Sequence, residues 1–140
     1  MLIICTLLGV IKYVGPVSPG TKSDITTFRE EFKDVSFVGK KIWADLGFYG
    51  LKESEIDGKI VMPHKKPKGK ELTDEQRSEN KNISAVRVIV ENAIAGCKHF
   101  FICQNRNRFK IRERIDEFFY ICSGLSNLKG AKRKSLNISI

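Results

Sequence analysis

Short apolar runs separated by breaks predict strands in the first half of the chain. The segment 2–14 is rich in Ile, Leu and Val and is interrupted at Gly9, which is typical of two strands joined by a tight turn. Two more short apolar runs, 41–44 and 59–62, are each predicted to form a strand, and the first of them ends at Asp45. Glycines follow directly after that strand, so Asp45 is predicted to stand at a turn.

Helical periodicity predicts the remaining elements. A helix capped by Ser23 or Asp24 is expected to run to about residue 32, and a polar helix is expected to begin at Thr73, which has capping-box spacing. Further helical patterns cover 83–100 and 111–125, with 101–103 as a strand or a helix end. Strands followed by helix, strand, strand and helices indicate an α/β fold with a mixed sheet.

The predicted helix over 83–100 carries two stripes of side chains. The first is apolar, recurs at spacings of three and four, and must face a core; its members are Ile83, Val86, Val90, Ile94 and Cys97. The second stripe falls within an arc of roughly 60° and holds Ser84, Arg87, Glu91 and Lys98. A carboxylate between two cations beside a buried face forms either a solvated salt-bridge ladder or the edge of an active site where Glu91 holds a metal.

Asp45 also has two interpretations. It closes a strand that is predicted to be buried, and the following turn exposes it at the carboxyl edge of the sheet, where α/β folds favour ligand sites. An aspartate after a strand also often caps the next turn. Considered alone, the position of Asp45 favours the structural role.

Composition and charge point to a basic globular protein. A chain of 140 residues with 41% apolar content suits one domain. The 25 Lys and Arg residues outnumber the 16 Asp and Glu residues and give a net charge of +9, which favours polyanions such as nucleic acid. Basic side chains gather in 65–70, 106–114 and 129–134. We expect a domain over 1–128 and a basic, flexible tail over 129–140.

Cysteine usage and the first residues indicate a reduced, cytoplasmic protein that is not bound to a membrane. No C-x-x-C pair or zinc-finger spacing occurs among Cys5, Cys97, Cys103 and Cys122, which we expect to be free thiols. Residues 1–11 are apolar but lack a basic leader and a small-residue cleavage site. Lys12 ends the run far short of a membrane span.

Two spaced blocks make the chain similar to a known family. Asp45-Leu46-Gly47-Phe48 matches a D-x-G-[FY] block, and Arg87-x3-Glu91-x6-Lys98 matches an R-x3-E-x6-K block. The connecting segments 19–24, 63–67, 71–73, 80–84 and 124–128 also fit. From Gly15 to Leu128 the chain resembles the DDE endonucleases of bacterial insertion sequences and the related Harbinger-type transposases. Either block alone is a modest signal, whereas both in order with these connections are a strong one.

The resemblance implies a ribonuclease-H-like fold and metal-dependent DNA cleavage and strand transfer in transposition. In the family the two blocks hold the second and third acids of a catalytic triad. Asp45 and Glu91 would therefore be catalytic residues and ligands of Mg²⁺ or Mn²⁺, while Arg87 and Lys98 would orient Glu91 or neutralise phosphate. The partner would be DNA, as transposon ends and target. Its backbone would be followed by Lys65, Lys66, Lys68, Lys70, Arg106, Arg108 and Lys110.

Two departures from the family pattern bear on activity. Ser84 stands where the fuller motif has Tyr, which keeps a hydroxyl but loses a ring. The family's first catalytic Asp lies on a first strand upstream of the predicted hairpin, and no Asp or Glu occurs before Asp24. We therefore expect a C-terminal transposase fragment without its first strand, inactive or nearly so by itself. An N-terminal half from another reading frame, or self-association, would complete it.

Two other functions stay open. A basic DNA-binding or transposase-assembly module without chemistry would bind DNA in a salt-dependent way, regardless of Asp45 or Glu91. An independent nuclease would need other acids from the segment 30–34, whose spacing does not indicate a site. Trp43 and the aromatic cluster 118–120 are predicted to be core rather than base-stacking platforms.

Overall fold

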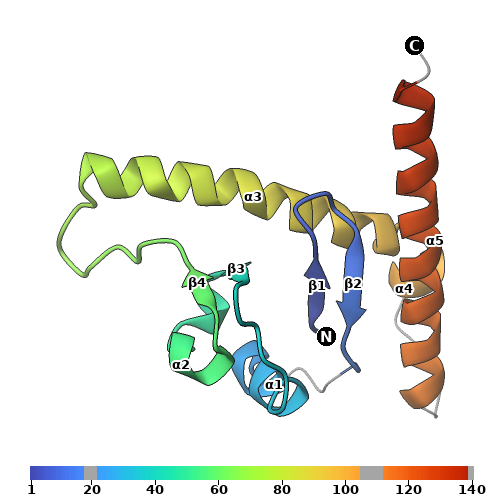
Figure 1. Cartoon of the computed structure of the whole chain (residues 1–140), viewed down its shortest axis with the longest axis horizontal. Coiled ribbons are helices and arrows are strands. Elements are labelled where there is room, and N and C mark those ends of the chain that lie inside the picture. Colours follow the sequence, from blue (N-terminus) through green and yellow to red (C-terminus); the bar gives the residue numbers. More distant parts are fainter. Residues whose placement is uncertain (18–21, 105–111, 139–140) are drawn as a thin grey trace. The chain divides into compact units, whose positions relative to one another are not determined.

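The computed structural model describes residues 1–17, 22–104 and 112–138, which have the predicted α/β composition (Figure 1). In chain order the elements are β1 (Ile3–Cys5), β2 (Ile11–Val14), α1 (Asp24–Glu31), β3 (Lys41–Trp43), the 3₁₀ turn η1 (Leu46–Phe48), α2 (Glu53–Ile56), β4 (Lys59–Val61), α3 (Asp74–Lys98), α4 (Phe101–Gln104) and α5 (Arg112–Ile138). The chain divides into two compact units. Unit 1 comprises Met1–Ser18 and Ile89–Ile140, and unit 2 comprises Pro19–Val88.

The strands form two separate two-stranded sheets. In unit 1, β1 pairs antiparallel with β2, and in unit 2, β3 pairs parallel with β4. Both kinds of pairing expected of a mixed sheet are therefore present. The two pairs belong to different units, so one continuous mixed sheet stays a prediction. The alternation of apolar and polar residues along a strand indicates which face of the strand is buried. It does not identify the neighbouring strands.

The predicted turn in the first hairpin is confirmed. Gly9 adopts a φ of +74°, a conformation that favours glycine, and its amide donates to the carbonyl of Thr6 at 2.9 Å. The Thr6 hydroxyl also accepts from the amide of Val10 at 3.2 Å. These bonds among neighbouring residues close the turn of the hairpin.

The core of unit 1 lies where the hairpin meets the second half of α3 and α5. Ile11, Val14, Ala93 and Cys97 form its buried centre, and Phe119 packs against them. Cys97 is only 1% exposed, and its Sγ lies 3.2 Å from the Ser123 hydroxyl of α5. The cysteines at 5, 97, 103 and 122 are free, as predicted.

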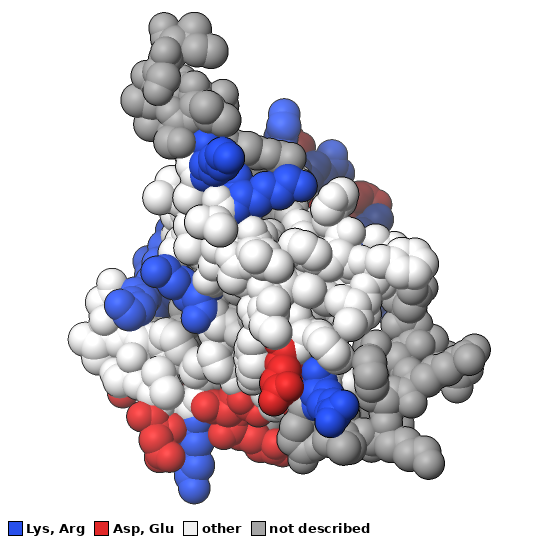
Figure 2. All heavy atoms as spheres, turned by 90° about the vertical axis from the view of Figure 1, so that its right-hand side faces the viewer, with Lys and Arg blue, Asp and Glu red and all other residues white. Residues whose placement is uncertain are grey.

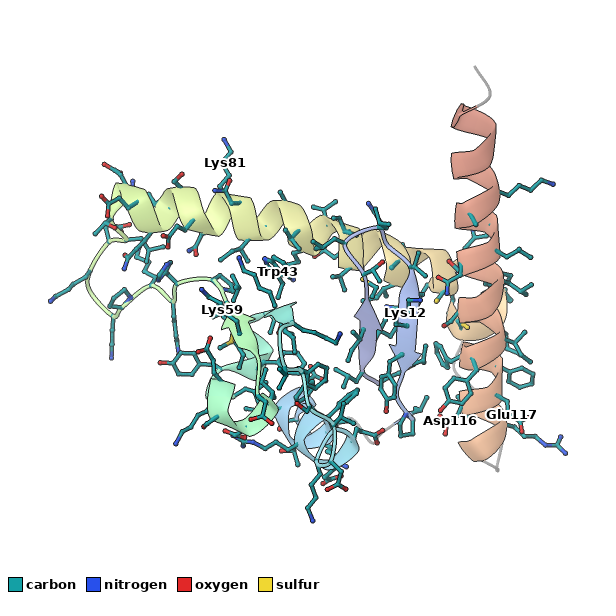
Figure 3. All side chains as sticks on the ribbon, viewed as in Figure 1. Lys12, Trp43, Lys59, Lys81, Asp116 and Glu117 are labelled. Atoms are coloured by element: carbon teal, nitrogen blue, oxygen red, sulfur yellow. The ribbon has the colours of Figure 1, made fainter. Side chains whose placement is uncertain are left out.

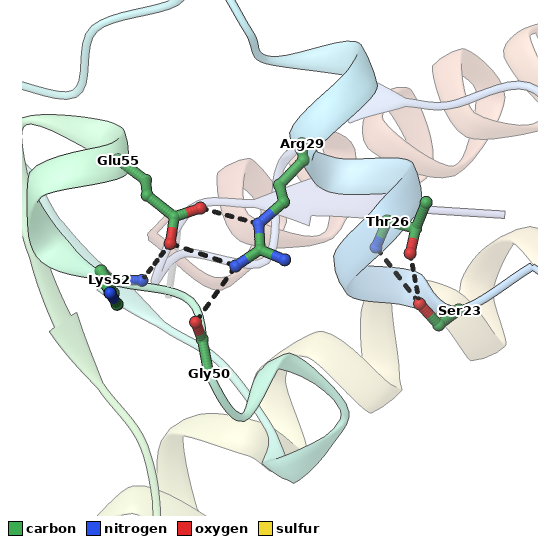
Figure 4. Close-up of polar contacts among 6 residues, drawn as sticks. All are labelled: Ser23, Thr26, Arg29, Gly50, Lys52 and Glu55. Carbon is green, nitrogen blue, oxygen red and sulfur yellow. Dashed lines mark hydrogen bonds and ion pairs between the residues drawn. The ribbon is translucent and has the colours of Figure 1, made fainter.

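An aromatic cluster and the ion pair between Arg29 and Glu55 join elements of unit 2. The ring of Phe28 on α1 lies within 4.9–6.0 Å, centroid to centroid, of the rings of Phe32, Phe37 and Phe48. The Arg29 guanidinium donates to Glu55 at 2.7 Å and to the carbonyl of Gly50 at 3.2 Å (Figure 4). These contacts join α1 to the crossover between β3 and β4, and so support the turn that carries Asp45.

The long helices differ from their predicted bounds. The polar helix expected from Thr73 and the apolar helix expected over 83–100 are one continuous helix, α3. Its predicted capping box is confirmed, because the Gln76 amide donates to the Thr73 hydroxyl and the Thr73 amide donates to the Gln76 side chain. No Gly or Pro separates the two patterns, so one helix satisfies both. The last helix also runs beyond the predicted residue 125, to Ile138.

Candidate active site and nucleic-acid interface

Asp45 stands exposed at the carboxyl end of β3. The preceding strand is half-buried, and the Ala44 amide extends the pairing with β4 by donating to the carbonyl of Val61 at 3.0 Å. Asp45 then caps η1, with its Oδ1 accepting from the Gly47 amide at 2.9 Å. The structure therefore contains both predicted features: a turn cap, and a carboxylate presented to solvent beyond a strand end.

Gly47 lies beside two carboxylates. A Cβ added at this glycine would stand 2.9 Å from Asp45 Oδ1 and 3.7 Å from Asp24 Oδ2. Sequence reasoning gave Asp24 only a capping role, but the cap of α1 is Ser23, whose hydroxyl accepts from the Thr26 amide (Figure 4). Asp24 is thus a second acid near Asp45, and only the folding of α1 against η1 reveals it.

Glu91 lies on an exposed stripe of α3 with its two predicted companions. Arg87 and Lys98 are also exposed, and the three residues follow one another on one continuous helix. Glu91 stands one turn after Arg87 and two turns before Lys98, as the block spacing requires. Asp45 belongs to unit 2 and Glu91 to unit 1, so their approach to a common metal stays a prediction.

Three exposed carboxylates are the candidate metal ligands. Asp45, Asp24 and Glu91 offer carboxylate oxygens, the donor type that Mg²⁺ and Mn²⁺ take. Within the described ranges, no group of three or more His, Cys, Asp or Glu side chains is placed to hold an ion. The ligand chemistry of these side chains therefore fits a divalent metal.

The basic segment 65–70 forms an exposed loop that α3 holds at its base. Asn80 accepts from the His64 amide at 2.7 Å and donates to the His64 carbonyl at 3.1 Å, and the His64 ring contacts Glu79. Beyond this anchor, the predicted DNA-binding residues Lys65, Lys66, Lys68 and Lys70 are exposed. The Lys65 ammonium lies over the Tyr49 ring, and Lys66 pairs with Glu71 at 2.5 Å. The other predicted phosphate contacts, Arg106, Arg108 and Lys110, lie outside the described residues.

The predicted aromatic core is confirmed only in part. Trp43 is half-buried and lines an apolar groove of about 420 Å³ in unit 2, beside Ile83 and Val86 of α3 (Figure 3). Phe119 packs on the core of unit 1, whereas Tyr120 is 50% exposed. Neighbouring residues on a helix point in different directions, so a run of aromatic residues cannot be buried as a block.

Several segments that match the family contain structural contacts that sequence reasoning did not assign. Asn127 accepts from the Ile11 amide and donates to the Ile11 carbonyl, both at 2.9 Å, which repeats on β2 the arrangement of Asn80 on the loop. A Cβ at Gly96 would stand 2.4 Å from the Ser126 hydroxyl, so this glycine lets α3 and α5 approach closely. The sequence offered one signal for these contacts: Asn80, Asn127 and Gly96 all lie inside segments that fit the family pattern.

Comparison with known proteins identifies the class. Residues 1–127 match the family described as DDE superfamily endonuclease, and the chain belongs to that family. A curated relative, the probable transposase for insertion sequence element IS702 of Microchaete diplosiphon, is 36% identical over 72 residues, which are 51% of this chain and 25% of the relative. The chain thus covers about a quarter of that relative. No solved structure matches the chain.

Family membership carries a general function. DDE superfamily endonucleases are DNA-acting enzymes of the transposition type and generally use divalent metal ions. Among the helices of the described segments, none is long and apolar enough to cross a bilayer.

Proposed function

We propose that these 140 residues carry the second and third acids, Asp45 and Glu91, of the ribonuclease-H-like DNA-cutting domain of a DDE transposase. The observation that supports this most is the coincidence of the family match over 1–127 with an exposed Asp45 at the end of β3 and an exposed Glu91 on α3. Glu91 stands on a regular helix, and Asp45 caps the turn after β3, where its hydrogen bond from the Gly47 amide holds the carboxylate in place.

The chain's own residues would position DNA and metal. Asp45 and Glu91 would ligate Mg²⁺ or Mn²⁺, and such ions, once bound, activate the attacking oxygen and stabilise the leaving one. The Gly47 amide fixes the Asp45 carboxylate through its 2.9 Å hydrogen bond. Arg87 and Lys98 would orient Glu91 or meet phosphate, and the lysines of the loop 65–70 would follow the DNA backbone with little sequence preference.

We further propose that these residues do not cleave DNA alone. The family mechanism uses a third carboxylate on a strand that precedes the hairpin, and no Asp or Glu precedes Asp24 here. That acid would come from a segment outside the 140 residues. In a plasmid-nicking assay with Mg²⁺ or Mn²⁺, we expect no cleavage. Nicking that Asp45→Asn abolishes would overturn this part of the proposal.

A Mn²⁺ titration tests the shared metal site directly. Bound Mn²⁺ should broaden the amide NMR signals around both Gly47 and Glu91 over one concentration range, because one ion would sit between the acids. Asp45→Asn and Glu91→Gln should each weaken both responses, while Glu75→Gln, an exposed carboxylate at the start of α3, should change neither. Independent responses at the two acids would refute the shared site.

A non-catalytic DNA-binding or assembly module is the second candidate. The exposed lysines of 65–70 favour it. It predicts salt-dependent DNA binding that Asp45→Asn and Glu91→Gln leave unchanged, together with no Mn²⁺ response at either acid.

A further inference from the structure

Helix α5 has two apolar faces, and the described residues of unit 1 cover only one of them. Phe119, Cys122, Ser123 and Asn127 face the hairpin and α3 within unit 1. On the opposite side, Ile121, Leu125 and Leu128 are 58%, 46% and 68% exposed. Their spacing of four and three residues places them in one stripe along the helix. Large aliphatic side chains aligned in this way mark an interaction surface more strongly than scattered ones.

The charged residues of this outer face lie at opposite ends of the stripe. Glu117 stands one turn before Ile121 and points away from β2, whereas Asp116 points toward β2 and accepts from the Val17 amide at 2.7 Å (Figure 3). Lys129 and Lys132 follow the last leucine and are exposed. Seen from the side of α5, uncharged surface separates a basic group near the C-terminal end from charged side chains toward the N-terminal end (Figure 2).

Gly124 lies in the middle of the same face. It is exposed, and a Cβ added there would meet no atom within 4 Å, so packing inside the chain does not require a glycine. A glycine in a helix costs about 1 kcal/mol relative to alanine. The presence of glycine at position 124 is explained if another helix approaches closely here and places a large side chain over the glycine.

We propose that the outer face of α5 binds the same face of a second copy of the chain, with the two helices antiparallel. A two-fold axis between Gly124 and Leu125 places each Leu125 over the partner's Gly124 and each Ile121 beside the partner's Leu128. The same axis places Glu117 opposite the partner's Lys132. A parallel pair would instead oppose Glu117 to Glu117, Lys132 to Lys132 and glycine to glycine. Charge and shape therefore favour the antiparallel dimer.

This proposal does not depend on catalysis, and analytical ultracentrifugation of the full chain tests it. We expect a monomer–dimer equilibrium in the micromolar range. Combined Leu125→Glu and Leu128→Glu substitutions should raise the dissociation constant at least about 100-fold, because charges would enter an apolar contact. Val38→Glu changes a residue that is 72% exposed in unit 2 and should leave association unchanged. Circular dichroism should show the same helix content in all variants, since these residues are exposed.

Charge reversal tests the orientation. Glu117→Lys should weaken the dimer by about tenfold, and adding Lys132→Glu should restore it to within about twofold. A chain that stays monomeric at roughly 1 mM overturns the proposal, as does a dimer that tolerates the paired leucine substitutions. A second substitution that fails to restore association refutes the antiparallel arrangement.

Discussion

Asn127 offers the sharpest test of how unit 1 is held together. Its side chain pairs with both backbone groups of Ile11, with two bonds of 2.9 Å that span 116 residues of sequence. Ile11 is only 6% exposed and belongs to the buried core. In an Asn127→Ala variant, the amide and carbonyl of Ile11 lose these partners at a site that water reaches poorly.

The expected destabilisation follows from these contacts. A hydrogen bond contributes about 1 kcal/mol net, and a buried group left unsatisfied costs about 1–3 kcal/mol. Partial solvation in the variant lowers that cost, so we expect a loss of about 2–3 kcal/mol in the free energy of unfolding. Urea denaturation followed by circular dichroism measures this loss. Hydrogen exchange at the Ile11 amide measures it locally, and the exchange rate should rise by about 30- to 150-fold.

Asn92→Ala is the matched control, because Asn92 is an exposed asparagine on α3. It removes the same atoms from a helix, so it should change stability by less than about 0.5 kcal/mol. If Asn127→Ala proved no worse than Asn92→Ala, or if the Ile11 amide kept its protection, the paired hydrogen bonds would not hold α5 to β2.

Three further predictions test other contacts. The hydrogen bond from Arg29 holds the pKa of Glu55 below its usual value, so the stabilisation is present at neutral pH and is lost as the pH falls through the lowered pKa. The melting-temperature advantage of wild type over Glu55→Gln should therefore be constant above about pH 5 and shrink in stronger acid; an advantage that grows in acid would contradict this. Burial, followed by a hydrogen bond with a neighbouring thiol, raises the pKa of Cys103 to about 12. Iodoacetamide at about pH 8 should thus alkylate Cys103 roughly a thousandfold more slowly in native protein than in urea, and equal rates would refute the shift. Gly96→Ala should destabilise the protein by displacing the Ser126 hydroxyl, and adding Ser126→Ala should recover that loss in a urea titration.

The sequence predicted which secondary-structure element carries each candidate site residue. It did not predict how those elements pack against one another. A short apolar run ending in Asp45 predicted a carboxylate after a strand, and the block spacing predicted Glu91 between two cations on one helical stripe. The proximity of Asp24 to Gly47 was not predictable, because it depends on how α1 packs against η1. The roles of Asn80 and Asn127 were hidden for the same reason, since each contacts backbone far away in the chain.

By itself, the sequence determined the local elements and the family. The hairpin around Gly9, a helix cap at Ser23 or Asp24 and the Thr73 capping box depend on bonds among neighbouring residues, so a few positions suffice to specify them. Tertiary structure alone decided that β3 pairs parallel with β4 and that one face of α5 is buried while the other is exposed. These outcomes depend on which distant surfaces meet, and hydrophobic periodicity records that a face is apolar without recording what covers it.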